Sequence, residues 1–313
     1  MTPPTTPRIP TFKVGDRQWP AIALTGLLLI LYGPLLYHWV DGWLNKSISI
    51  EHEYFSHGLL GLPFAAYIAW EKRPQWCQLP DQANGAGFAL ILVGIIAYFS
   101  GMVDAINLSF PIVFTGLCLW LKGPAGLRLL SFPLLLVLLA TPNEIPYLIA
   151  PYALPLQRFI AGVAAFLLFQ ARINVEVADI YLYVNGQTVE VAPHCAGLKM
   201  LFTSVYVGLM LVYWSGVMRY RRVVLPFLCG TVAISVAANI LRNTLLTYFH
   251  GTGQDGAFTW LHDSWGGDLY SALMLGSMVP LLQLLEWWFV PQPLTQQGAE
   301  AQAVRPEQEE SGD

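Results

Sequence analysis

The 27 residues from Val223 to Phe249, VVLPFLCGTVAISVAANILRNTLLTYF, contain one charged side chain, Arg242. About 20 apolar residues in a helix are enough to cross the hydrocarbon core of a lipid bilayer. The stretch therefore predicts a transmembrane helix, which we place at 222–249. A chain that contains such a segment is expected to be an integral membrane protein.

The composition of the whole chain agrees with a membrane protein. Of its 313 residues, 55% are hydrophobic and 12% are charged, and the mean hydropathy is +0.50. Soluble domains carry about 25% charged residues, so the composition excludes a cytosolic enzyme, a secreted enzyme and a disordered protein. The net charge of −4 and the lack of a long basic arm argue against nucleic-acid binding.

Further apolar runs predict an all-α polytopic membrane protein with about eight transmembrane helices. The first run continues to Trp39 and is too long for the apolar core of a cleaved signal peptide, so we interpret it as an uncleaved anchor. Besides 222–249, the expected spans are 20–38, 56–71, 86–103, 106–121, 127–141, 196–216 and 265–290.

Lysine and arginine in short loops set the predicted orientation, because these residues collect on the cytoplasmic side. The basic residues assigned to that side are Arg8, Lys13, Arg17, Lys72, Arg73, Lys122, Arg128, Arg219, Arg221 and Arg222. We therefore expect a cytoplasmic N-terminal segment at 1–19, a single integral membrane domain at 20–290 and a cytoplasmic tail at 291–313. The tail is acidic and rich in Gln, which predicts disorder.

One more apolar helix, near 151–170, conflicts with this orientation if it crosses the membrane. Span 127–141 ends outside and span 196–216 must begin outside. We therefore expect 151–170 to be a re-entrant or interfacial helix on the outer side. In the alternative topology, 127–141 does not span the membrane.

A short outer β-hairpin is expected before the most informative cysteine. Residues 180–184 and 187–191 flank Asn185-Gly186, a two-residue turn signal. The second strand leads to Cys195 at the start of span 196–216. There the unpaired N–H groups and the dipole of the helix favour a thiolate.

Cys195 is the candidate nucleophile among four cysteines, which are too few for a disulfide framework in a chain of this length. Cys77 falls in a cytoplasmic loop, and Cys118 and Cys229 fall within apolar spans. A thiolate nucleophile needs a proton-transfer partner. All six histidines fall on the outer side of the predicted topology: His38, His52, His57, His194, His250 and His262.

His262 is the better proton-transfer candidate, because the side chain of His194 diverges from that of its neighbour Cys195 at a helix start. Asp263 and Asp268 lie close to His262 in the sequence, and either could orient its ring. For His38, His52 and His250 we prefer an interfacial role.

Arg242 is an anomaly, since an arginine inside a membrane span is costly and usually functional. Ser235, Asn239 and Arg242 are spaced i, i+4, i+7 and form one polar stripe on the helix. In the structural alternative, Arg242 forms a salt bridge to Glu144 or Asp263. Lys199, one turn after Cys195, either strengthens the field at the thiolate or extends to the interface.

Four segments, in order along the chain, resemble motifs of the exosortase/archaeosortase family of membrane cysteine transpeptidases. The segments are Tyr54-Phe-Ser-His57-Gly58, Val189–Lys199, Asn239-Ile-Leu-Arg242 and His262 with the Gly-rich helix start after it. Where the family commonly has Ala-Cys-Ser-Gly-Leu-Arg, this chain has His194-Cys-Ala-Gly-Leu-Lys199, which looks like the cyanobacterial branch.

The resemblance implies roles for individual residues. Cys195 is the implied nucleophile, His262 the general acid/base and Arg242 the positive stabilising group. The candidate supporting residues are Asn239, Lys199, His194, Asp263 and His57. We expect no cofactor and no metal ion.

The resemblance also implies a substrate and a location. The substrates are exported proteins with a C-terminal sorting tail, made of a Pro-Glu-Pro-like motif, a transmembrane helix and a basic cluster. Cleavage takes place on the outer face of a bacterial inner membrane, and the hairpin at 180–191 is a candidate for pairing with an extended substrate. Membrane lipids, a surface acceptor and an accessory membrane protein are the other partners considered; nucleic acid is not.

Three other functions compete with this one. In a metal-dependent hydrolase, outer histidines with Glu51 and Glu53 are the ligands, although His52 and His57 are spaced i, i+5 instead of the i, i+4 of a helical zinc pair. In a small-solute transporter, Arg242 lines the path, although the sequence has no inverted repeat. A non-catalytic scaffold leaves the positions of Cys195 and Arg242 as coincidences.

Overall fold

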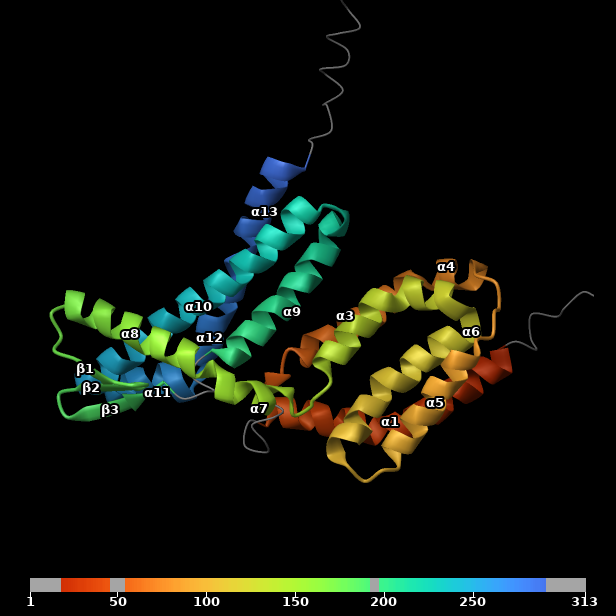
Figure 1. Cartoon of the computed structure of the whole chain (residues 1–313), viewed down its shortest axis with the longest axis horizontal. Helices are drawn as coiled ribbons and strands as arrows, with labels where there is room; N and C mark the ends of the chain where they lie inside the picture. The colour runs from red at the N-terminus through yellow and green to blue at the C-terminus, as the bar shows by residue number, and fades with distance from the viewer. Residues whose placement is uncertain (1–17, 46–53, 192–196, 291–313) are drawn as a thin grey trace, which may run out of the picture. The chain divides into compact units, whose positions relative to one another are not determined.

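The computed structural model describes residues 18–45, 54–191 and 197–290, and it is mostly helical with one small antiparallel sheet (Figure 1). The chain divides into two compact units, residues 1–144 and 145–313, and each is described by itself. The expected helical membrane fold is confirmed at this level, and the predicted hairpin is part of the sheet.

Five helices in the described ranges are long and apolar enough to cross a membrane: Ile22–Leu44, Val103–Ala140, Pro151–Gln170, Arg221–Gly251 and Trp265–Phe289. Two shorter apolar helices cover Gly85–Tyr98 and Leu198–Trp214. The structure therefore supports five candidate spans and does not show the expected eight. Segment 151–170 is one of the five, so its length and composition do not require the re-entrant placement that we expected.

The first unit contains α1 (Gln18–Leu44), α3 (Gly58–Glu71), α4 (Arg73–Gln78), α5 (Gly85–Tyr98) and α6 (Val103–Ala140). Helix α6 is two helices joined at Gly123, whose φ of 61° and ψ of −159° interrupt the helical geometry just before Pro124. This break falls between the expected spans 106–121 and 127–141.

Glycines allow α5 and α6 to pack closely. A Cβ atom on Gly87 would lie 2.3 Å from the backbone nitrogen of Trp120, and one on Gly116 would lie 2.9 Å from the backbone nitrogen of Ile91. Helix α1 joins this unit through a buried hydrogen bond, in which Trp39 Nε1 donates to Asn107 Oδ1 at 2.8 Å. This bond satisfies the buried indole N–H of Trp39 inside the unit.

The second unit holds the sheet and the longest uninterrupted helix. Its helical elements are α7 (Ile145–Ile149), η2 (Ala150–Ala153), α8 (Leu154–Gln170), α9 (Leu198–Trp214), η3 (Val217–Arg219), α10 (Arg221–Gly251), α11 (Asp255–Asp263), α12 (Trp265–Gly276) and α13 (Met278–Phe289). One core of this unit packs Val223 and Phe227 of α10 against Met278 and Leu282 of α13.

The sheet has the order β1 (Glu176–Ala178), β2 (Tyr181–Val184) and β3 (Gln187–Glu190), with both pairs antiparallel. Asn185 and Gly186 have φ values of 50° and 81°, as a type I′ turn requires, so the predicted two-residue turn is confirmed.

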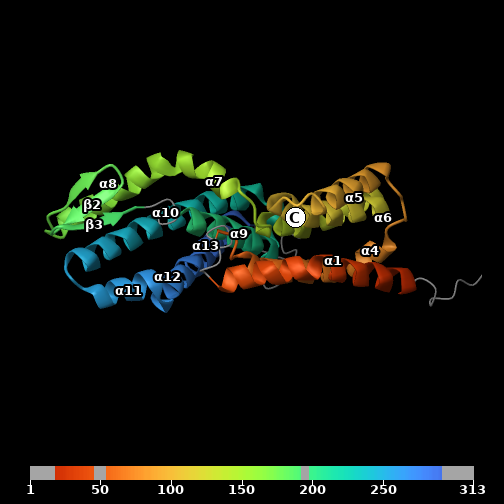
Figure 2. The same ribbon diagram turned by 90° about the horizontal axis from the view of Figure 1, so that it is seen from below.

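One face of the sheet packs onto helices. Leu182 and Val191 are fully buried in a cluster with Ile160 and Ala164 of α8. At the other end of the hairpin, a Cβ on Gly251 of α10 would lie 2.4 Å from a methyl carbon of Val184. Figure 2 shows the strands beside the C-terminal ends of α8 and α10. The sheet is therefore held at that end of α10.

Candidate active site

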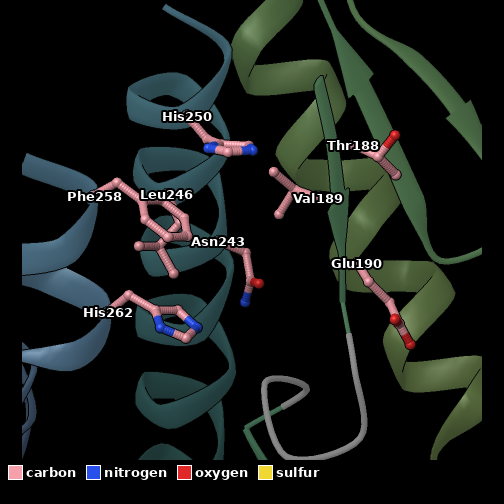
Figure 3. Close-up of a pocket in the computed structure, with 8 residues that line it drawn as sticks. All are labelled: Thr188, Val189, Glu190, Asn243, Leu246, His250, Phe258 and His262. Atoms are coloured by element: carbon pink, nitrogen blue, oxygen red, sulfur yellow. The ribbon is translucent and has the colours of Figure 1, made fainter. Parts of the chain in front are cut away.

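A pocket of about 170 Å³ lies between β3, α10 and α11 in the second unit (Figure 3). Three residues of each of β3 and α10 and two of α11 line it: Thr188, Val189, Glu190, Asn243, Leu246, His250, Phe258 and His262. The α10 residues are spaced i, i+3, i+7, which places them on one face of the helix. The pocket thus joins a strand, a long helix and a short helix from separate parts of the unit.

His262 is held in an orientation that suits proton transfer. Its Nδ1 lies 2.6 Å from Oδ1 of Asp263, and Figure 3 shows its ring pointing into the pocket. In the neutral ring, Nδ1–H donates to the carboxylate and Nε2 is the basic nitrogen. Of the two aspartates that were considered for this role, Asp263 contacts the ring, whereas Asp268 lies in the first turn of α12.

Three rings form one wall of the pocket. Phe258 stacks on His262 with ring centroids 5.2 Å apart and an interplanar angle of 9°, and His250 lies 5.0 Å from Phe258. Phe258 precedes His262 by one helical turn on α11, which places the two rings on one face. The sequence favours an interfacial role for His250 and does not single out Phe258. The i, i+4 spacing of Phe258 and His262 was the signal for their stacking.

Asn239 lies one turn before Asn243 on α10 and is 1% exposed. Asn243 Nδ2 donates to the backbone oxygen of Asn239 at 2.9 Å and to its Oδ1 at 3.3 Å. Asn239 Nδ2 is buried and has no hydrogen-bond acceptor among the residues that the structure describes. Asn239 Oδ1 accepts from Asn243, whereas the N–H groups of Asn239 Nδ2 remain available to donate to a ligand.

Gly197, just before α9, lies against Asn239. A Cβ on Gly197 would lie 2.8 Å from both Cγ and Nδ2 of Asn239, and Gly197 has a φ of 80°. Both features favour glycine at this position. Cys195 and His194, the candidates that precede it, lie outside the described residues.

Arg242 is partly buried on α10, one turn after Asn239. In the described part of the second unit it has no hydrogen bond and no ion pair. Arg242 forms no ion pair with Asp263, so that alternative salt bridge is wrong. The alternative pair with Glu144, which belongs to the first unit, stays a prediction. A Cβ on Gly267 would lie 3.8 Å from Nη2 of Arg242, so the guanidinium lies beside the first turn of α12.

The remaining candidates are not among the residues that line the pocket. Lys199 is partly buried in the first turn of α9. His57 lies in the first unit, where its buried Nε2 donates to the backbone oxygen of Leu139 at 3.2 Å. Within the described ranges, no three His, Cys, Asp or Glu side chains form a group that could hold a metal ion. Glu51, His52 and Glu53 fall outside those ranges.

Comparison with known families gives one match. A model of the transmembrane exosortases, Exosortase_EpsH, matches residues 39–279. The match begins in α1, ends in α13 and covers well over half of the chain. All the site residues discussed above lie within it. No curated protein and no solved structure matches the chain.

Proposed function

Because the chain belongs to the transmembrane exosortase family, we propose that it cleaves the C-terminal sorting tail of exported proteins through a thioester on Cys195. Family membership implies a multi-pass membrane transpeptidase that sorts proteins with PEP-CTERM tails. The assignment of the individual catalytic residues, the outer location of the site and the thioester are the parts that we add.

One arrangement carries the proposal. His262, oriented by Asp263, points into a pocket whose opposite wall is β3, and β3 ends at Glu190, five residues before Cys195. Two residues after Cys195, Gly197 rests on Asn239. Two peptide units separate Cys195 from Gly197, and consecutive Cα atoms are about 3.8 Å apart. The proposal requires that the thiol of Cys195 faces the side of α10 that carries Asn239 and Arg242.

In the proposed reaction, the Cys195 thiolate attacks the scissile carbonyl carbon. A C–S bond forms and the carbonyl π pair moves onto oxygen, which becomes an oxyanion. The guanidinium of Arg242 stabilises this charge, and Asn239 Nδ2–H is an available donor. The intermediate then collapses, the C–N bond breaks, and protonated His262 gives its proton to the leaving amine.

The second half of the proposed reaction releases the acyl group. An acceptor amine or a water molecule attacks the thioester carbonyl, and His262 takes the proton of the attacking group. The thiolate leaves, which returns Cys195 and His262 to their starting states. Amine attack gives transpeptidation and water attack gives hydrolysis.

The proposed topology follows the loop charges and the family match. The match crosses the boundary at residue 144, which supports one functional membrane domain at 20–290. We place the termini in the cytoplasm of a bacterium, the pocket on the outer face of the inner membrane, and eight spans in total. The segment His194–Lys199 supports the cyanobacterial branch of the family.

The test is a processing assay in membranes. A reporter with a sorting-type tail is coexpressed with the wild type and with Cys195→Ala, Arg242→Ala or His262→Ala, and the mass of its new C-terminus is measured. We expect all three variants to lose cleavage at normal protein levels. Cys229→Ala is the matched control, since this thiol is exposed on α10 of the same unit and its removal opens no cavity.

The alternatives predict other outcomes in the same assay. If Cys195→Ala processes the reporter and a chelator stops the reaction, the metal-dependent hydrolase replaces the thiol enzyme. If neither treatment changes the reporter and no new C-terminus forms with the wild type, the proposed cleavage is wrong.

A further inference from the structure

Strand β3 is an edge strand. It pairs with β2 on one side, and no described strand pairs with its other side. Val191 N–H donates to the Ile180 oxygen at 2.9 Å, and the register continues as Leu182 with Val189. Hydrogen-bonded and non-hydrogen-bonded pairs alternate in an antiparallel ladder. Thr188 and Glu190 therefore direct their N–H and C=O groups to the open edge.

The open edge of β3 borders the pocket. Thr188 and Glu190 line the pocket, yet Figure 3 shows their side chains pointing away from α10, while Val189 points towards α10. The two side chains belong to the exposed face of the sheet. On that face Thr188 pairs across the strands with Tyr183, and Glu190 pairs with Tyr181. What these two residues present to the pocket is consequently their main chain.

The shape of the pocket suits a narrow ligand. Its volume of about 170 Å³ is below the roughly 300–1,000 Å³ of pockets that enclose a small organic molecule. The wall opposite β3 is apolar and aromatic, with Leu246 and Phe258, and His262 stands in the same wall. An extended peptide matches both walls, because it offers main-chain hydrogen bonds on one side and side chains on the other.

The direction of β3 along α10 sets the direction of such a peptide. Val184, at the hairpin turn, meets Gly251 at the end of α10, whereas Gly197, beyond β3, meets Asn239 near the middle of that helix. The chain from β3 onward thus runs from the C-terminal end of α10 towards the interior of the helix. A substrate whose tail helix must enter the membrane has to run the same way.

We propose that the segment of the substrate before its scissile bond adds to β3 as a fourth, parallel strand. It exchanges main-chain hydrogen bonds with Thr188 and Glu190, and every second side chain faces the rings of Phe258 and His262. The scissile bond then follows directly, beyond Glu190. This inference rests on the proposed function, and it assigns the subsite through which that function binds its substrate.

The first test separates main chain from side chain. Glu190→Pro removes an N–H from the open edge, and Glu190→Ala removes only the side chain. We expect reporter cleavage by Glu190→Pro to be about fivefold or more below that of Glu190→Ala, the loss for one main-chain hydrogen bond. Val177→Pro is the matched control: Val177 faces Leu182 at the opposite open edge of the same sheet, so cleavage by this variant should stay at the wild-type level.

The second test measures binding without turnover. In a Cys195→Ala background, Thr188→Cys is combined with a series of reporters that carry one cysteine at successive positions before the scissile bond. Alternate residues of a strand point to opposite faces, and a disulfide needs Cα atoms within about 7 Å, so we expect the disulfide yield to peak at one reporter position and to be absent at the positions directly before and after it. Tyr183→Cys, exposed on the same face but one strand further in, should form none.

The outcomes distinguish this inference from the proposed function. Loss of cleavage in Cys195→Ala together with no crosslink at any position, or with equal crosslinks at neighbouring positions, overturns strand addition alone. Equal cleavage by Glu190→Pro and Glu190→Ala also overturns it. Normal cleavage by Cys195→Ala overturns the thiol mechanism, and the crosslinking pattern still reports whether the peptide pairs with β3.

Discussion

At the scale of residues, Asn239 combines full burial with an amide N–H that has no acceptor among the described residues. A donor of this kind, directed at an oxyanion, contributes to the reaction more than to packing. We expect Asn239→Ala to lower the cleavage rate by about 100-fold, the scale for loss of one oxyanion donor. Alkylation of Cys195 by iodoacetamide should keep its wild-type rate, because alkylation forms no oxyanion.

Ser235→Ala is the control for that prediction. Ser235 is equally buried and lies one turn before Asn239 on the same stripe of α10. It should cleave at close to the wild-type rate. If Asn239→Ala slows alkylation and cleavage to the same extent, the amide acts on the thiol and not on the oxyanion.

Asp263 allows a second prediction at this scale. Asp263→Asn keeps the shape of the side chain but removes the charge that stabilises protonated His262. Since the two side chains are 61% and 37% exposed, water screens the pair, and we expect a fall of only about tenfold in cleavage, at the low end for acid–base catalysis. Asp255→Asn, an exposed position on the same helix, serves as the comparison. A wild-type rate for Asp263→Asn would remove the carboxylate from the mechanism.

Sequence patterns found some of the site residues and missed others. Arg242 and Asn239 stood out because a polar group in an apolar helix is costly, and His262 with Asp263 because they adjoin a span. His250, Phe258 and Glu190 carry no comparable signal in the sequence that would assign them to the site. Their common pocket depends on β3, α10 and α11 meeting in space, and no local pattern encodes that meeting.

At the scale of elements, the contact of α5 with α6 depends on glycine. We expect Gly87→Ala to lower the unfolding free energy by about 1–3 kcal/mol, the cost of overpacking, because the added Cβ meets backbone atoms of α6 at 2.3 Å. Thermal unfolding in detergent measures the effect. Gly85→Ala, on the same helix with nothing within 4 Å, should unfold at the wild-type temperature; equal shifts in both variants would contradict the packing argument.

The elements themselves followed the sequence where the signal was local. Asn185-Gly186 specified the hairpin turn, and the apolar run at 222–249 specified α10. The break of α6 at Gly123 fell between two predicted helices, since Gly-Pro interrupts a helix. Helix α11 was not predicted: its nine residues, Asp255–Asp263, are too few for a clear periodic pattern.

At the scale of the whole molecule, the proposed orientation can be read from chemical labelling. In intact spheroplasts with Cys195→Ala as background, an impermeant maleimide should label Gln254→Cys and leave Cys77 unlabelled, because we place these exposed residues on opposite faces. Labelling of Cys77 from outside would reverse the topology.

The same assay tests the placement of α8. Tyr152 precedes this helix and is 82% exposed. If α8 is re-entrant, Tyr152→Cys reacts from the outer face, as we expect from the loop charges. Reaction only after permeabilisation would show that the helix crosses the membrane, and a different parity would then apply to the preceding spans.

Helix α10 has 31 residues and is therefore about 46 Å long at 1.5 Å per residue, whereas the hydrocarbon core is about 30 Å thick. In the proposed orientation its surplus length stands clear of the lipid and carries Leu246 and His250 with it. The length of the helix then determines how far the pocket lies above the hydrocarbon core. The proposed function then implies that the distance between the tail helix and the cleavage point selects substrates, and that bilayer thickness helps to determine which bond is cut.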